Sequence, residues 1–122
     1  MTDLSDFIDP SVPPSGDGCV ECEEAGGWWV HLRRCALCGH VGCCDESLET
    51  HATKHYEATG HRVVRSYEPG EEWFFDYLTR EFSFGPHLVP PESRPATQSS
   101  PGPAERLPHD WQEQLAAKRR EA

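Results

Sequence analysis

The chain has 122 residues and a formal net charge of −10, and its apolar residues make up only 36% of the total. Such a chain has room for one small domain with a thin core. Nucleic acids and anionic membranes are polyanions, so this charge argues against both as partners. No run approaches the roughly 18 apolar residues that span a bilayer, and the acidic N-terminus has no apolar centre like that of a signal peptide. We therefore expect a cytoplasmic protein.

The two ends of the chain read as flanking segments. Prolines and glycines interrupt any periodic pattern in residues 1–18, which we predict to be disordered. Residues 85–122 are predicted to be a Pro-rich disordered tail, with a possible short helix from near Asp110 to Arg120 that has only Trp111 and Leu115 to bury. One folded domain is expected between them, over residues 19–84.

All six cysteines and five of the seven histidines lie between Cys19 and His61. In order they read Cys19-x2-Cys22, Cys35-x2-Cys38, Cys43-Cys44 and His51-x3-His55-x5-His61. Structural zinc takes four thiolate or imidazole ligands, so this window can supply two tetrahedral sites and we expect two Zn²⁺ ions as cofactors. The alternative of a six-cysteine disulfide framework suits a cytoplasmic chain less well, and it leaves the three spaced histidines without a role.

Around these ligands the pattern predicts three strands and one helix. Residues 28–33, 62–67 and 73–77 are rich in aromatic and β-branched residues and read as strands. A helix is predicted to start at a cap formed by Asp45 or Ser47, to carry His51 and His55 on one face, and to end at Gly60. The expected fold class is α+β: a small zinc-stabilised domain with one main helix on a short antiparallel sheet.

The segments Cys38-Gly-His-Val-Gly-Cys43, His51-Ala52-x2-His55 and Thr59-Gly60-His61 carry a family likeness. Through them residues 19–77 resemble the UBP-type zinc finger, a ubiquitin-binding module attached to some deubiquitinases and deacetylases, and above all its small free-standing bacterial members. The resemblance implies an interleaved division of ligands. One zinc would take Cys19, Cys22, Cys43 and His51, and the other Cys35, Cys38, His55 and His61.

Two other ligand arrangements stay open at this point. An all-cysteine ribbon could use Cys19, Cys22, Cys35 and Cys38, which leaves Cys43, Cys44, His51 and His55 for the second ion. Cys44 could also replace Cys43 as a ligand, although a small buried thiol is the simpler interpretation. His31 and His40 are expected to be strand or loop residues outside both sites.

The resemblance also implies a pocket for the C-terminal tail of a protein or peptide. In the ubiquitin-binding members, aromatic side chains enclose the terminal Gly-Gly, and an arginine after the closing Cys-Gly contacts the carboxylate. The corresponding aromatic residues here are Trp73 and Phe75, with Trp28 or Trp29 nearby.

The chain departs from the family at the arginine. Cys44-Asp45 stands where the family has Gly-Arg, and Asp45 would repel a carboxylate, so this contact with ubiquitin is not carried over. Arg33, Arg34 and Arg62 are the candidates for a replacement cation.

The sequence argues against an enzyme. Both zinc sites are filled by four protein ligands, whereas catalytic zinc keeps a position for water. Ala52 stands where the HExxH motif has the Glu that acts as general base. Bound zinc would also suppress the redox reactivity of the thiolates in either CxxC pair. We expect a monomeric, non-catalytic peptide-binding module. The alternative is a regulatory or adaptor protein with purely structural zinc, whose tails bind partners.

Overall fold

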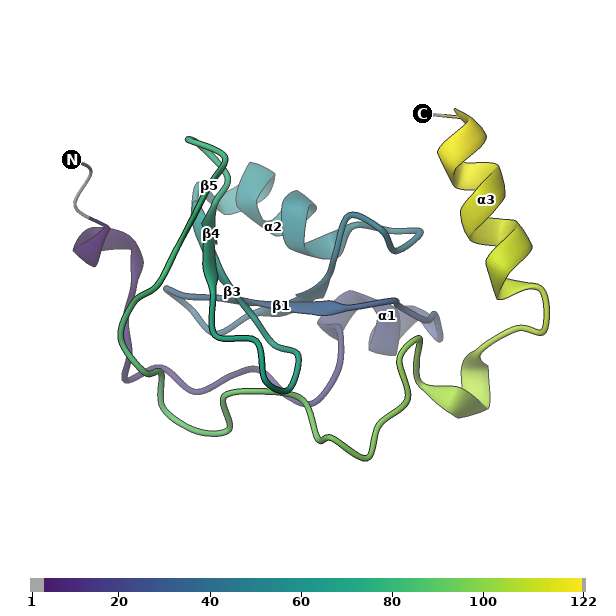
Figure 1. Cartoon of the computed structure of the whole chain (residues 1–122), viewed down its shortest axis with the longest axis horizontal. Coiled ribbons are helices and arrows are strands. Elements are labelled where there is room, and N and C mark those ends of the chain that lie inside the picture. Colours follow the sequence, from purple (N-terminus) through teal and green to yellow (C-terminus); the bar gives the residue numbers. More distant parts are fainter. Residues whose placement is uncertain (1–3, 122) are drawn as a thin grey trace.

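The computed structural model describes residues 4–121. In chain order the elements are η1 (Ser5–Phe7), α1 (Val20–Ala25), β1 (Leu32–Cys35), β2 (Val41–Cys43), α2 (His51–Thr59), β3 (Val63–Ser66), β4 (Phe74–Asp76), β5 (Glu81–Ser83), η2 (Ala104–Arg106) and α3 (Trp111–Glu121). Across this range the strands form one antiparallel sheet in the order β2-β1-β3-β4-β5 (Figure 1). The α+β class and the placement of one main helix on the sheet are confirmed.

Helix α2 lies on one face of the sheet, against β1 and β2. The close approach requires a glycine, because a Cβ at Gly42 would lie 2.7 Å from the backbone nitrogen of Ala52. Gly60 adopts a left-handed conformation (φ 77°) and ends the helix, as predicted. The packing on β2 holds the first turn of α2, with its metal ligand His51, next to Cys43 at the end of that strand.

The opposite face is covered by the segments that the sequence analysis expected to be disordered (Figure 1). The buried guanidinium of Arg34 donates hydrogen bonds to the carbonyl oxygens of Val12 (2.7 Å), Val89 (3.1 Å) and Pro91 (3.0 Å). Arg65, beside it on β3, donates to the carbonyl oxygen and carboxylate of Glu92. This packing could not be predicted from the sequence, because the sheet holds these proline-rich segments by their carbonyl groups, which no residue pattern reveals.

The core has two parts, and the second draws on residues outside the expected domain. One contains Trp29, Leu32, Val41 and Tyr67 together with the ligand cysteines of the first metal cluster. The other contains Ala36, Val63, Phe74 and Leu88, with Leu4, Phe7 and Ile8 packed against it. The boundaries 19–84 therefore remain a prediction about the folding unit, while flanking residues contribute to the packing.

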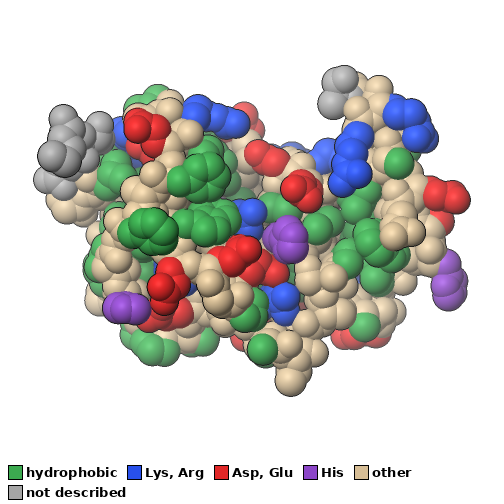
Figure 2. All heavy atoms as spheres, viewed as in Figure 1, with side chains coloured by type: hydrophobic (Ala, Val, Ile, Leu, Met, Phe, Trp, Pro, Cys, Tyr) green, Lys and Arg blue, Asp and Glu red, His purple; other side chains and the backbone are tan. Residues whose placement is uncertain are grey.

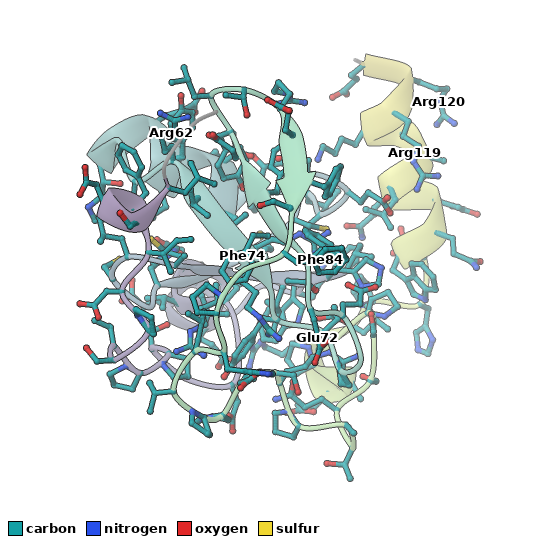
Figure 3. The ribbon with its side chains drawn as sticks, turned by 60° about the vertical axis from the view of Figure 1, so that its left-hand side comes forward. Arg62, Glu72, Phe74, Phe84, Arg119 and Arg120 are labelled. Atoms are coloured by element: carbon teal, nitrogen blue, oxygen red, sulfur yellow. The ribbon has the colours of Figure 1, made fainter. Side chains whose placement is uncertain are left out.

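The C-terminal helix α3 forms as predicted and attaches to the loop after β2. Leu115 is buried, and the Lys118 ammonium donates to the carbonyl oxygens of Asp45 (2.8 Å) and Ser47. Arg119 and Arg120 point away from the sheet (Figure 3). Among residues 4–121, no helix is long and apolar enough to cross a membrane.

Candidate metal centres and peptide-binding cavity

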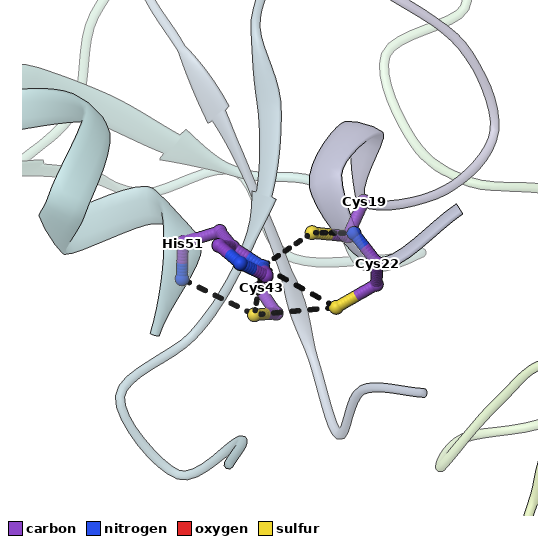
Figure 4. Close-up of side chains that lie close together, drawn as sticks. All are labelled: Cys19, Cys22, Cys43 and His51. Atoms are coloured by element: carbon purple, nitrogen blue, oxygen red, sulfur yellow. Dashed lines mark hydrogen bonds between the residues drawn. The ribbon is translucent and has the colours of Figure 1, made fainter. Parts of the chain in front are cut away.

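The first cluster brings together Cys19, Cys22, Cys43 and His51 (Figure 4). The Nδ1 atom of His51 lies 3.2, 3.3 and 3.4 Å from the sulfur atoms of Cys19, Cys22 and Cys43, respectively. All four potential ligand atoms lie within 4.8 Å of one another. The three cysteines are buried, and His51 is partly buried.

Sulfur atoms of this cluster also cap two helices. Cys43 Sγ accepts the backbone N–H of His51 at 3.2 Å, and Cys19 Sγ accepts that of Cys22 at 3.5 Å. The predicted cap of α2 by Asp45 or Ser47 is therefore wrong, since α2 begins after Thr50 without a side-chain cap from that residue. A thiolate near the positive end of a helix is electrostatically favourable, so metal ligation and helix initiation use the same atoms.

The chemistry of this cluster fits a zinc ion. Hydrogen bonds from the Cys19 and Cys22 thiols lower the pKa of Cys43, which favours a thiolate in this cluster. The cysteine and histidine donors converge on one buried point, and every one of them belongs to the ligand set that structural zinc prefers. A bound cation would compensate the buried sulfur charge and would lower the pKa of the remaining thiols.

The second cluster contains Cys35, Cys38, His55 and His61 and is more open to solvent. Cys38 Sγ lies 3.3 Å from His55 Nε2, and Cys35 Sγ lies 3.6 Å from His61 Nδ1. Burial, assisted by the charges of His40 and His61, lowers the pKa of His55 to about 4. His55 is therefore neutral near pH 7, which is the form that binds a metal.

The two clusters form the interleaved arrangement, and the protein has two zinc sites of this kind. The first site joins two cysteines before β1 to Cys43 and His51 after it, and the second joins the end of β1 and the turn after it to the two histidines in and after α2. Each ion therefore closes a loop in the chain. Cys19 and Cys22 do not share a site with Cys35 and Cys38, so the all-cysteine ribbon is not formed. All six cysteines are free thiols, which excludes the disulfide framework from this structure.

The cysteine and histidines expected outside the sites do lie outside them. Cys44 is buried, with its sulfur 3.6 Å from the hydroxyl of Ser47. His31 pairs with the buried carboxylate of Glu68 at 3.2 Å. His40 stacks on His55 and thus supports a ligand without being one.

These features define a class, a compact domain held by two interleaved structural zinc sites. The family model described as "Zn-finger in ubiquitin-hydrolases and other protein" matches residues 19–88, and the chain belongs to this family. A similar solved structure is the solution NMR structure of protein RPA1320 from Rhodopseudomonas palustris. It is 39% identical, with a TM-score of 0.61, and the match covers 83% of this chain and 97% of that one.

A small cavity of about 190 Å³ lies beyond α2, on the same face of the sheet. Aromatic residues from β4, β5 and their flanks line it, together with Arg33 and residues of the loop after β2. The lining residues are Arg33, Cys44, Asp45, Glu46, Val64, Trp73, Phe75, Tyr77 and Phe82. Trp73 and Phe75, two of the four predicted peptide-binding residues, thus meet here. Tyr77 and Phe82 were missed; the aromatic character of residues 73–77 was the available signal for Tyr77.

Trp28 and Trp29 do not line this cavity. Both are buried, and Trp29 exchanges two backbone hydrogen bonds with Gly102 at 2.8 and 2.9 Å. Trp29 packs in the core with Leu32 and Tyr67. The structure therefore buries both tryptophans away from the cavity, and Trp29 packs in the core beside the C-terminal segment.

The structure places the three candidate arginines in different environments. Arg34 is buried against backbone carbonyl groups, and Arg62 is engaged by the carboxylate of Asp76. Only Arg33 lines the cavity, where its guanidinium carbon lies 4.7 Å from the centre of the Trp73 ring. None of the ion pairs among residues 4–121 involves Arg33.

Proposed function

We propose that this protein is a non-catalytic module that binds the C-terminal tail of another protein or peptide in the cavity beside α2. The observation that carries the proposal is Arg33, a cation without a carboxylate partner among the described residues, held over Trp73 inside an aromatic enclosure. A terminal carboxylate needs such a charge-assisted donor, and the flat faces of aromatic rings pack well on glycine backbone. The two zinc ions would hold the walls in place without taking part in chemistry.

Arg33 would act in place of the arginine that the family carries after its closing cysteine. It reaches the cavity from β1, whereas Asp45 occupies the corresponding position in the loop after β2. The Asp45 carboxylate accepts a hydrogen bond from the hydroxyl of Thr53 on α2, which partly satisfies its charge. Asp45 and Glu46 would then favour a tail that also carries basic side chains.

The experiment is a calorimetric titration of the zinc-loaded protein with four-residue peptides that end in Gly-Gly. We expect binding of the free-acid peptide and little binding of its C-terminal amide. Arg33→Gln should weaken binding of the free acid by about 10- to 100-fold, which is the range for a hydrogen bond to a charged group. Arg119→Gln is the matched control, because Arg119 is an arginine that points away from the sheet.

A titration without heat or saturation across diverse free-acid tails would overturn the proposed function. Equal affinity for the acid and the amide would also contradict it, since the terminal carboxylate would then not contribute to binding. Unchanged circular dichroism and zinc content in Arg33→Gln would show that the variant remains folded.

A further inference from the structure

The exposed large hydrophobic side chains of residues 4–121 gather on one hairpin. Leu78, Phe82 and Phe84 are 62, 66 and 84% exposed, and they lie in or beside the β4–β5 hairpin. Figure 2 shows hydrophobic side chains grouped on the part of the surface where Figure 1 draws these strands. A small, highly charged protein does not need such a group for its own packing, and contiguous exposed apolar surface marks interaction sites.

Beside this hairpin lies a groove of about 980 Å³, separate from the tail cavity. One wall is formed by β5 and the residues that follow it, Phe84 and Gly85, and the N-terminal segment forms the other, with Leu4 and Ile8. Phe82 lines both the groove and the tail cavity. The two hollows are therefore neighbours that share one aromatic side chain.

Strand β5 is an edge of the sheet. Within residues 4–121 its only strand neighbour is β4, so backbone groups on its outer side have no strand partner. Phe82 pairs with Phe75 and so lies on the cavity side of the sheet, while Glu81 and Ser83, one residue away, lie on the other side with the groove. A strand added along β5 would direct alternate side chains to these two sides.

We propose that the bound partner also contributes a strand: the segment that precedes its C-terminal tail pairs with the open edge of β5. The choice of this partner rests on the proposed function, whereas the open edge and the groove are observed independently of it. The segment is an extended peptide with apolar side chains for Phe82, Phe84 and the groove. Its other side chains are basic, which matches Glu81, Asp45, Glu46 and the net charge of −10. The same net charge opposes pairing with a second copy of the chain.

The test compares two free-acid peptides ending in Gly-Gly, one of four residues and one of twelve with alternating leucine and lysine upstream. The longer peptide should bind at least tenfold more tightly, as expected when one further buried apolar anchor is added. Phe84→Ser should remove most of that gain and leave the four-residue peptide unaffected. Leu78→Ser is the matched control, since Leu78 is also an exposed apolar residue of the hairpin but lines neither hollow.

The remaining outcomes separate the two proposals. If the short peptide binds and the long one binds no better, the strand addition is wrong and the tail cavity stands. If neither binds, the tail function fails. Amide chemical-shift changes at residues 81–84 with the long peptide alone support the proposed edge, whereas a protein dimer that Phe84→Ser dissociates would assign the edge to self-pairing and overturn the proposal.

Discussion

The imidazole ring of His40 lies parallel to that of His55, with ring centroids 4.1 Å apart and an interplanar angle of 4°. The Nε2 atom of His40 in turn lies 2.9 Å from the carboxylate of Glu21 on α1. Glu21 sits between the first-site ligands Cys19 and Cys22, while His55 is a ligand of the second site. This contact therefore links the two zinc sites through side chains that bind no metal.

The difference in burial predicts an order of metal loss. The second site includes exposed Cys38 and partly exposed His55 and His61, whereas all three cysteines of the first site are buried. A chelator added in steps should remove the zinc at Cys38 first and should unfold the chain when the other ion leaves, because structural zinc contributes on the order of 10 kcal/mol in small fingers. Native mass spectrometry with circular dichroism measures both events. Circular dichroism unchanged by full metal removal would contradict the structural role of zinc.

Gly42 predicts a steric effect on the helix that carries two zinc ligands. A Cβ there would lie 2.7 Å from the nitrogen and 2.9 Å from the Cα of Ala52. Gly42→Ala should destabilise the protein by about 1–3 kcal/mol, the usual cost of overpacking, and should weaken zinc retention. Denaturant unfolding of the zinc-loaded protein measures it. Gly16→Ala is the control, because nothing lies within 4 Å of a Cβ at Gly16.

The ion pair of His31 predicts a pH dependence. The hydrogen bond with Glu68 raises the pKa of His31 despite the opposing effect of burial. Because the folded pKa lies above the unfolded value of about 6.5, this stabilisation is fully present below that value and is lost as pH rises through the folded pKa. His31→Gln should therefore destabilise the protein more at pH 5.5 than at pH 8.5. An NMR titration should place His31 above about 6.5 and should show a lower pKa in Glu68→Gln; a His31 pKa below 6.5 would contradict the prediction.

The hydrogen bonds of Lys118 are expected to hold α3 against the loop after β2. Its ammonium bonds the carbonyl oxygens of Asp45 and Ser47, in the loop that borders the tail cavity. Lys118→Ala should raise amide hydrogen exchange in α3 about fivefold, since a factor of five to ten corresponds to the loss of one modest interaction. Arg119→Ala should leave the exchange unchanged, because Arg119 points away from the sheet (Figure 3). Equal effects of both substitutions would show that Lys118 does not hold the helix.

Ligand spacing made the zinc sites predictable. Pairs such as Cys35 and Cys38 are separated by two residues because a tight turn must present both sulfur atoms to one ion, so the sequence itself encodes the geometry. The helix around His51 and His55 was predictable for a related reason, since side chains four residues apart share one helical face. The family resemblance then supplied the division of ligands between the two ions.

Other features depend on contacts that no local pattern records. The short elements β2 and β5 have three residues each, too few to show an alternating pattern, and the sheet alone gives them their pairing. Trp28 and Trp29 were expected at the peptide site because aromatic residues suit both a pocket and a core. Trp29 instead forms an isolated β-bridge with Gly102, more than seventy residues away, and no local pattern records that contact.

The buried Arg34 side chain has a practical consequence for dissecting this protein. A fragment cut at the matched boundaries, residues 19–88, would lack Val12, Val89 and Pro91, which supply every carbonyl group that receives its outer N–H groups. The excised finger would lose these hydrogen bonds and would expose to solvent the sheet face that Leu4, Phe7 and Ile8 also cover. Low solubility or low yield of such a fragment would reflect this uncovered sheet face and would say nothing about its zinc sites.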